Sequence, residues 1–338
     1  MKKLLLLLTI FVTFPAAAQY FTYEYDGQTL EYQIISASAK TCRTKPGEAL
    51  ADGGFKAGNK VSGNLIIPDY AVDSAGVSYK VIQIGNGGFT ECDELKRVIF
   101  PDGITLIGEY AFFRCGLTGN LHLPNDLITI SAHCFEECQN LTGSLLIPEG
   151  VTSIAASAFS SCRGFNGSLI MPDKLTYIGE RAFYYCTDFT GPLIIPDAVT
   201  YIGANAFYYC CRFEGSLTIP DKVTFIGRCA FGECYRLNGT LTLGTSLKTV
   251  GDIPFYGCDF TEIKCLNPIP ANHIDGAVDR IFTNHQLKKV LYVPAESILQ
   301  YKESNFAYGF EKVEPHWIHS PVAPVTKPVT KNNSNTHI

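Results

Sequence analysis

The stretch FTGPLIIPDAVTYIGANAFYYC, residues 189–210, determines how the chain folds. Leu193 and Ile195 occupy alternate positions in it, which is typical of a short strand with one buried face. Residues 199–202 begin a second extended piece, and the apolar spacing over 206–210 favours a single helical or 3₁₀ turn. Proline, aspartate and glycine supply the corners between these pieces. None of the pieces is long enough for a regular helix.

The same pattern repeats along the chain with a period of 23 or 24 residues. The first strand of each unit ends at a proline or, once, at a glycine: Pro101, Pro124, Pro148, Pro172, Pro196, Pro220 and Gly244. A second series, the cysteine ladder, consists of cysteines that each follow a phenylalanine by three residues: Cys92, Cys115, Cys138, Cys162, Cys186, Cys210, Cys234 and Cys258. Because one unit cannot bury its own apolar side, the units must stack and share a continuous core.

The step from Pro101 to Pro124 is 23 residues, and every later step is 24. Most units also carry an additional glycine just before the first strand: Gly119, Gly143, Gly167, Gly191, Gly215 and Gly239. We expect each of these glycines to form a bulge or corner with positive φ, a conformation that glycine adopts without steric cost.

The repeating unit resembles that of the BspA-like leucine-rich repeat family. The stretch LKRVIFP at 95–101, followed by Ile107-Gly108 and by AFFRC at 111–115, is similar to the family pattern at almost every position. The similarity extends over about residues 61–262. It implies a leucine-rich repeat solenoid of the α/β horseshoe class, rich in β structure with short helical or 3₁₀ turns. About eight coils of 23–24 residues are expected, with a β-hairpin N-terminal cap and a C-terminal cap.

Five segments are expected along the chain. Residues 1–18 have a basic start, an apolar stretch and small residues before position 19, which are the features of a signal peptide. Residues 19–60 should form the N-terminal cap and 61–262 the leucine-rich repeats. The resemblance places the C-terminal cap at 263–318, and residues 319–338 have the composition of a flexible tail.

The composition sets limits on function. With 338 residues, of which 46% are apolar and 17% charged, the chain can bury a large core. The formal net charge is −5 and no basic run is present to neutralise phosphates, so the sequence predicts no nucleic-acid partner. After the predicted signal peptide, no apolar run approaches the roughly 20 residues of a membrane-spanning helix.

Thirteen cysteines admit two interpretations: disulfides or metal ligands on one side, and buried free thiols on the other. Each ladder cysteine would have equivalent neighbours in the coils above and below, which favours buried thiols over pairs. Cys134 supports this interpretation, since it takes a position that alanine holds in other units. Four cysteines lie elsewhere and are the candidates if any disulfide forms: Cys42, Cys211, Cys229 and Cys265. The sequence does not pair them.

The sequence predicts no metal site, no cofactor and no enzyme activity. Zinc sites use cysteine or histidine in close doublets, which this chain lacks, and its seven histidines form no catalytic signature. A row of carboxylates follows the strand ends: Asp69, Asp102, Glu149, Asp173, Asp197 and Asp221. Such a row could bind calcium, but aspartate after proline is ordinary turn chemistry, which is the favoured interpretation.

Several outward-facing positions in the central units carry aromatic or aliphatic residues. We expect eight of them to line a ligand surface: Tyr177, Tyr201, Phe225, Leu146, Ile170, Ile194, Tyr184 and Tyr208. Exposed contiguous aromatic residues usually mark an interaction surface. The sequence leaves an alternative equally open, in which these residues are good strand formers that stack only on one another.

These observations predict an exported, non-catalytic binding protein, secreted, at the cell surface or in the periplasm. The resemblance implies an adhesin-like module that contacts an extracellular protein, since some relatives attach to host matrix proteins such as fibronectin and fibrinogen. Two alternatives remain open: a glycan-binding accessory protein, and a structural spacer without a ligand. The sequence does not determine the oligomeric state.

Overall fold

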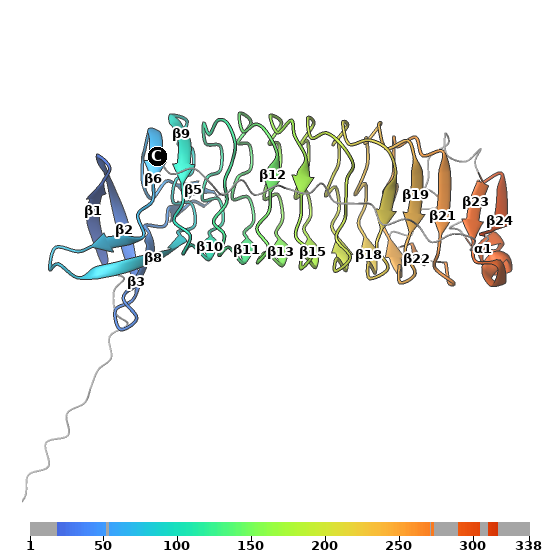
Figure 1. The fold of residues 1–338 in the computed structure, drawn as a ribbon, viewed down its shortest axis with the longest axis horizontal. Helices are drawn as coiled ribbons and strands as arrows, with labels where there is room; N and C mark the ends of the chain where they lie inside the picture. Colours follow the sequence, from blue (N-terminus) through green and yellow to red (C-terminus); the bar gives the residue numbers. More distant parts are fainter. Residues whose placement is uncertain (1–18, 52–53, 271, 274–289, 305–309, 317–338) are drawn as a thin grey trace, which may run out of the picture.

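The chain winds into a long rod of stacked coils (Figure 1). The computed structural model describes residues 19–51, 54–270, 272–273, 290–304 and 310–316. Successive coils lie side by side along the rod, and their buried side chains form one continuous cluster from Leu30 to Tyr301. The predicted leucine-rich repeat solenoid is therefore confirmed.

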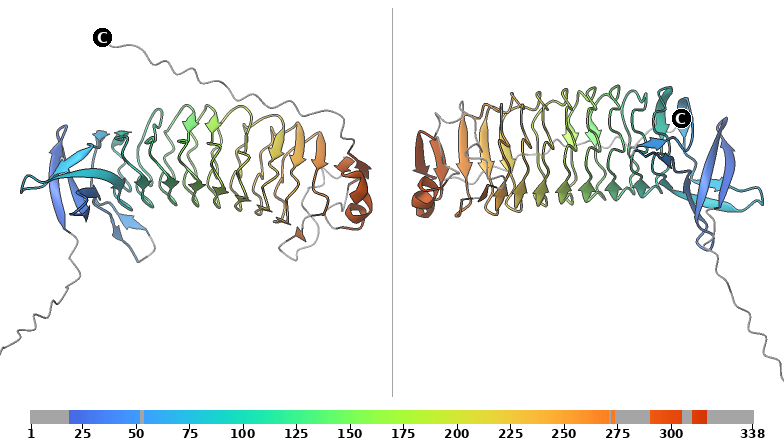
Figure 2. Two further views of the ribbon diagram at one scale, coloured as in Figure 1. Left: turned by 60° about the horizontal axis from the view of Figure 1, so that its bottom comes forward. Right: turned by 180° about the vertical axis from the view of Figure 1, so that it is seen from behind.

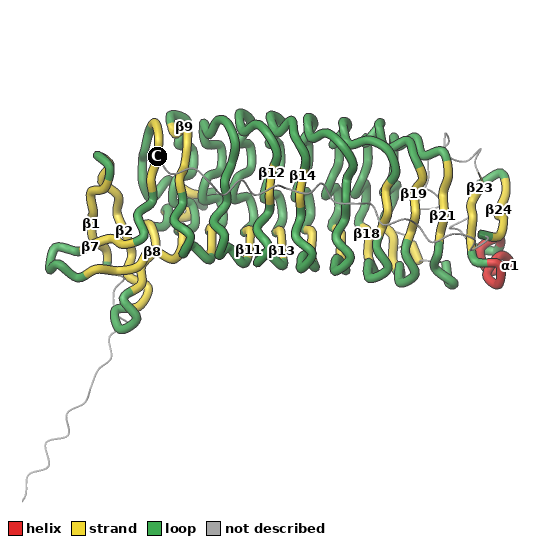
Figure 3. The backbone as a smooth tube through the Cα atoms, viewed as in Figure 1, coloured by secondary structure: helices red, strands yellow, loops and turns green. Residues whose placement is uncertain are grey.

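One sheet runs along nearly the whole rod, and we call it the long sheet. In the repeats it is built from the second extended piece of each coil, whose two-residue strands pair in parallel and in register. Its strands in spatial order are β1 (Tyr20–Tyr25), β2 (Gln28–Ser36), β3 (Thr41–Thr44), β8 (Ser78–Ile84), β10 (Leu106–Ile107), β11 (Thr129–Ile130), β13 (Ser153–Ile154), β15 (Tyr177–Ile178), β16 (Tyr201–Ile202), β18 (Phe225–Ile226), β20 (Thr249–Val250) and β22 (Asn272–His273), and β7 (Tyr70–Val72) also pairs with β8. Turns and corners make up most of each coil (Figure 3).

The first extended piece of each coil contributes to a second row of strands, which is broken into three sheets. These are β6 (Gly63–Ile66) with β9 (Leu95–Ile99), then β12 (Leu145–Leu146) with β14 (Leu169–Ile170), and finally β17 (Leu217–Ile219), β19 (Thr240–Leu243), β21 (Glu262–Cys265), β23 (Val290–Val293) and β24 (Lys312–Pro315). The breaks fall at residues 119–123 and 192–195, next to isolated bridges at Gly119 and Gly191. Pro192 has no N–H group to donate to a ladder at the second break.

Different elements close the two ends of the rod (Figure 2). At one end β1 and β2 form an antiparallel hairpin, and β4 (Glu48–Ala49) pairs with β5 (Phe55–Lys56). At the other end lie the helices of the described chain, the 3₁₀ helix η1 (Ala295–Ser297) and α1 (Ile298–Lys302). The predicted signal peptide, the predicted tail and parts of the predicted C-terminal cap lie outside the described residues. The boundaries between caps and repeats stay predictions.

The segment after each second strand is a run of tight turns. In the coil that contains Phe183, the N–H groups of Ala182 and Cys186 bond to carbonyls three residues back, which is the 3₁₀ pattern. The N–H groups of Arg181, Phe183 and Tyr185 donate instead to carbonyls of the next coil, at 2.8–2.9 Å. Arg181 and Tyr185 have φ values of +53° and +56°. This left-handed backbone stops a helix from continuing and leaves alternate N–H groups for the next coil.

Two columns of side chains join the coils inside the rod. One phenylalanine per coil stacks on the next, with ring centroids 5.2–5.6 Å apart: Phe89, Phe112, Phe135, Phe159, Phe183, Phe207, Phe231 and Phe255. Beside this column, the ladder thiols from Cys115 to Cys258 each donate to the carbonyl oxygen of the phenylalanine in the preceding coil, with S···O distances of 3.0–3.2 Å. Each thiol therefore packs as a small apolar group and also joins two coils through a buried hydrogen bond.

The additional glycines are of two types, so the prediction that all six have positive φ is wrong. Four of them have φ between +74° and +83°: Gly119, Gly143, Gly191 and Gly215. Gly167 and Gly239 do not have positive φ. A Cβ atom at either position would lie 2.7 Å from the backbone nitrogen of Ser144 or Ser216 in the adjacent coil. Glycine is required there by the space between coils and not by the backbone conformation.

Replacing a ladder cysteine should destabilise the rod. The Cys186→Ala variant loses the thiol hydrogen bond to the Phe159 carbonyl and creates a small cavity. We therefore expect the free energy of unfolding to fall by about 1–2 kcal/mol. Urea unfolding under reducing conditions, followed by circular dichroism, measures this change. The matched control is Cys211→Ala, because Cys211 is half-exposed and lies off the ladder; its effect should stay within about 0.5 kcal/mol. Equal midpoints for the two variants would contradict the proposed contribution of the ladder.

Alkaline pH should weaken the fold through the ladder thiols. Burial raises the pKa of Cys138 from 9.0 to about 12. Between these values the thiol is ionised in the unfolded chain and protonated in the native chain, so stability is intact below pH 9 and falls as the pH rises toward 12. We expect Cys138→Ala to lose stability less steeply in this window, by about 1.4 kcal/mol per pH unit, as measured by urea unfolding. Well below pH 9 the two slopes should coincide, and identical slopes above it would show that this thiol does not titrate as stated.

Candidate functional site

Three aromatic side chains form a continuous row across the long sheet, which we call the aromatic row. Tyr177, Tyr201 and Phe225 occupy the first position of β15, β16 and β18, which pair in register. The ring centroids of neighbours lie 4.8 and 4.5 Å apart, and the ring planes are within 8° of parallel. A buried isoleucine follows each of the three residues. Because successive side chains of a strand point to opposite faces, the rings lie on the outer face of the sheet.

The aromatic row is partly exposed to solvent. Tyr177 is 39% exposed, and Tyr201 and Phe225 are half-buried; burial raises the pKa of Tyr201. The same strand position holds Ser153 in the coil before the row and Thr249 in the coil after it, with the same parallel register. Since serine and threonine support the same pairing, the fold does not require aromatic residues at these three positions.

A second group of aromatic residues, the tyrosine cluster, lies on the turn segments of the same coils. The predicted residues Tyr184 and Tyr208 stack at a centroid distance of 5.5 Å, and Tyr185 and Tyr209 stack beside them at 4.7 Å. All four are half-buried. The guanidinium of Arg181 lies over the ring of Tyr184, 5.7 Å from its centroid, as in cation–π pairs. Among the ring contacts of the described residues, none joins this cluster to the aromatic row.

The three aliphatic residues predicted for the same surface lie in the second row of strands. Leu146 in β12 pairs with Ile170 in β14, and Ile194 falls at the break over residues 192–195. The aromatic row belongs to the long sheet, so these two sets lie in different sheets. The eight predicted residues therefore form three separate strips: the aromatic row, the tyrosine cluster and the aliphatic strip.

A hollow of about 590 Å³ lies at the first break in the second row of strands, and we call it the strand-break hollow. Leu146 forms part of its wall, together with Arg97, Asn120 and His122. Of these wall residues, only Leu146 is among the site residues predicted from the sequence. The available signal was that the unit at 95–101 lacks the additional glycine of the later units, so that its first strand is one residue shorter than the corresponding segment of the next unit.

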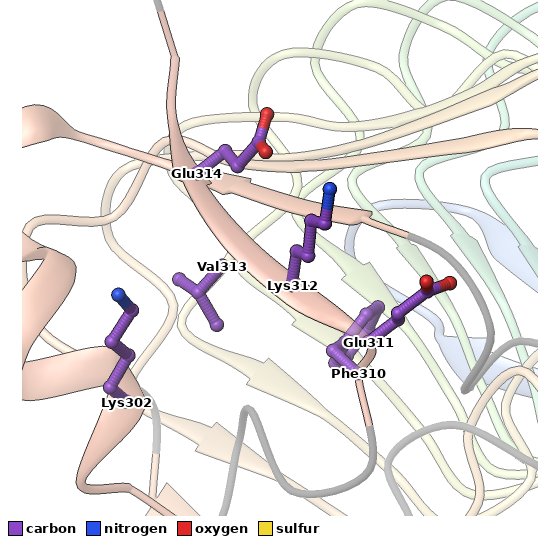
Figure 4. A pocket seen from close by; sticks show the side chains of 6 residues that line it. All are labelled: Lys302, Phe310, Glu311, Lys312, Val313 and Glu314. Atoms are coloured by element: carbon purple, nitrogen blue, oxygen red, sulfur yellow. The ribbon is translucent and has the colours of Figure 1, made fainter.

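A smaller hollow of about 450 Å³ lies at the C-terminal end of the rod (Figure 4). The hollow is lined by Lys302 of α1 and by residues 310–314. Of these, residues 312–314 belong to β24. Along this last strand the charges of Lys312 and Glu314 have opposite sign. Charged side chains on an edge strand discourage pairing with other chains, which favours a protective role for this end.

The other groups considered in the sequence, the cysteines and the carboxylate row, make contacts within the fold. All thirteen cysteines lie within the described residues as free thiols, including the four disulfide candidates Cys42, Cys211, Cys229 and Cys265. Of the predicted carboxylate row, Asp102 accepts a hydrogen bond from the Asn125 amide and Asp221 accepts one from the backbone N–H of Thr245, both at 3.0 Å. In the described part of the chain, no group of three or more His, Cys, Asp or Glu side chains is placed to hold a metal ion. Over the same residues, no helix has the length and apolar character needed to cross a bilayer.

The stacked coils and their repeated side-chain columns define a leucine-rich repeat protein. The model of the BspA type leucine rich repeat region matches six copies in this chain, over residues 71–190 and 200–314. The chain therefore belongs to the BspA-type leucine-rich repeat family, and the resemblance noted in the sequence is confirmed. Proteins built from this repeat are generally binding proteins and not catalysts.

The chain is also similar to solved structures of bacterial leucine-rich proteins. A leucine-rich cell surface protein from Faecalibacterium prausnitzii is 22% identical with a TM-score of 0.46, over 87% of this chain and 94% of that chain. The leucine-rich repeat protein of T. pallidum is 21% identical with a TM-score of 0.44, over 68% of this chain and 86% of that chain. No curated protein matches the sequence.

Proposed function

We propose that this protein acts outside the cell as a non-catalytic module that binds another extracellular protein, and that the aromatic row is the centre of its contact surface. Membership of a repeat family made of binding proteins supports this function. The signal peptide predicted at residues 1–18 supports export, although those residues lie outside the described part of the chain.

The aromatic row is the main support for this proposal, because the fold does not require aromatic side chains at these three strand positions. Ser153 and Thr249 maintain the same strand pairing on either side. Three consecutive coils nevertheless present large rings, which stack face to face and remain partly exposed to solvent. Rigid aromatic side chains bury large areas on binding with little loss of conformational entropy, which is why tyrosine is enriched in protein interfaces.

The tyrosine cluster extends the same argument to the adjacent turns. Its four rings are preorganised by stacking, and Arg181 is held over one of them. Tyrosine and arginine, together with tryptophan, are enriched at the energetically important positions of protein interfaces. We therefore place this cluster at the edge of the contact surface.

Removing the aromatic row should weaken partner binding while the rod stays folded. The test variant combines Tyr177→Ala, Tyr201→Ala and Phe225→Ala. The probes are immobilised fibronectin and fibrinogen, the matrix proteins that the family resemblance suggests, with binding followed by surface plasmon resonance. We expect saturable binding of the unmodified protein to at least one probe, and a loss of affinity of about tenfold or more in the variant.

The matched control changes the same strand position in flanking coils, by combining Thr129→Ala, Ser153→Ala and Thr249→Ala. It should bind like the unmodified protein, and thermal unfolding of both variants monitors the fold. Retained binding by a folded aromatic-row variant would exclude this row as the contact surface. Failure of the unmodified protein to bind either probe would contradict the matrix-protein assignment and favour a spacer.

A further inference from the structure

The strand-break hollow arises from a mismatch in length between two neighbouring coils. Pro101 follows Leu95 by six positions, but Pro124 follows Leu117 by seven, because the second coil contains Gly119. The two coils remain joined where the Thr118 N–H donates to the Lys96 carbonyl, at 2.9 Å. Beyond that bond they cannot stay in register. In the described chain β9 pairs only with β6, and residues 119–123 form no strand.

Three polar side chains in the hollow are available to a ligand. Within the described part of the chain, Arg97, Asn120 and His122 have no side-chain hydrogen bond or ion pair. Nearby, the carboxylate of Asp102 accepts a hydrogen bond from Asn125, and both residues line the same hollow. A protein that leaves a guanidinium, an amide and an imidazole without partners around one concave surface has the elements of a binding site.

The apolar part of the wall is also exposed. Ile99 and Leu146 are 49% and 53% exposed, and both line the hollow. The volume lies within the range of small-molecule sites. The hollow therefore offers a few apolar faces together with several planar hydrogen-bonding groups.

The balance of charge selects the class of ligand. Arg97 and Asp102 contribute opposite charges, and the other polar groups are amides and an imidazole. An anion would approach the Asp102 carboxylate, and a cation would approach the Arg97 guanidinium, so neither is favoured. Hydroxyl groups both donate and accept, and can use all of these side chains at once. An extended peptide does not fit as an added strand, because Phe112 stacks on Phe89 and Phe135 at 5.2 and 5.3 Å, which keeps the coils together.

We propose that the strand-break hollow binds a neutral saccharide unit, with Arg97, Asn120 and His122 bonding to its hydroxyls and Ile99 and Leu146 contacting its C–H faces. This site lies in a different sheet from the aromatic row and does not depend on the function proposed for that row.

The test is calorimetric titration of the protein with neutral sugars: glucose, galactose, mannose, N-acetylglucosamine and the disaccharides maltose, cellobiose and lactose. We expect saturable binding of at least one. A variant with Arg97→Ala and His122→Ala should bind that sugar at least about tenfold more weakly, because it loses one charged and one neutral hydrogen-bonding group. The matched control combines Arg236→Ala with Thr218→Ala, two exposed residues outside the hollow, of which Thr218 holds the strand position equivalent to that of His122. This control should keep the original affinity.

Glucuronic acid provides a test of charge selection, since it differs from glucose by a carboxylate. Tighter binding of glucuronic acid than of glucose would overturn the assignment to neutral sugars. Absence of saturable binding to every sugar, or equal affinity in the hollow variant and the control variant, would overturn the site itself. Thermal unfolding of both variants shows whether any loss of binding comes from loss of fold.

Discussion

The structure depends on one constraint: no coil can satisfy its own backbone. In each turn segment, alternate N–H groups can bond only to carbonyls of the following coil, because left-handed residues such as Arg181 and Tyr185 interrupt any local helix. The ladder thiols add bonds in the other direction, from each coil to the one before it. A single coil would leave these polar groups buried without partners, so the rod is stable only as a stack whose ends are closed by other elements.

This constraint separates the residues that make the fold from those that are free to make a site. The phenylalanine column and the ladder thiols recur from coil to coil, because each phenylalanine stacks on its equivalent in the next coil and each thiol bonds to a phenylalanine carbonyl of the preceding coil. The outward position of the long sheet contacts only its neighbours on the surface, and it changes from Ser153 to Tyr177 without any change of register. Residues at such positions can therefore change with little effect on folding. For this reason, large aromatic residues there indicate a binding role more strongly than buried residues do.

The sequence period was sufficient to predict the coils, the buried columns and the outward direction of Tyr177, Tyr201 and Phe225, since all of these follow from alternation and spacing. It could not separate Leu146 from the aromatic row, because alternation assigns a residue to one face of a strand but not to one of two sheets. It also could not show why Gly167 differs from Gly119. Glycine is required at 167 by close contact with the adjacent coil, whereas Gly119 is required by its positive φ. In the described chain β9 pairs with β6 but with no strand of the following coil. This open edge depends on the relative length of two coils, a property that neither coil has alone.

The contact surface proposed at the aromatic row and the saccharide site proposed in the strand-break hollow illustrate two ways in which a regular stack can acquire a site. The row keeps the repeat geometry and changes only side chains, so it gives a flat, extended surface suited to a large partner. The hollow lies where strand pairing between two neighbouring coils is interrupted. It places charged, polar and apolar side chains around one small concave surface, which suits a small ligand. In a solenoid, coils interact only with their nearest neighbours, and two coils lie between the coil of Asn120 and the coil of Tyr201. Changes at the two sites should then combine additively, so each function can be altered without disturbing the other.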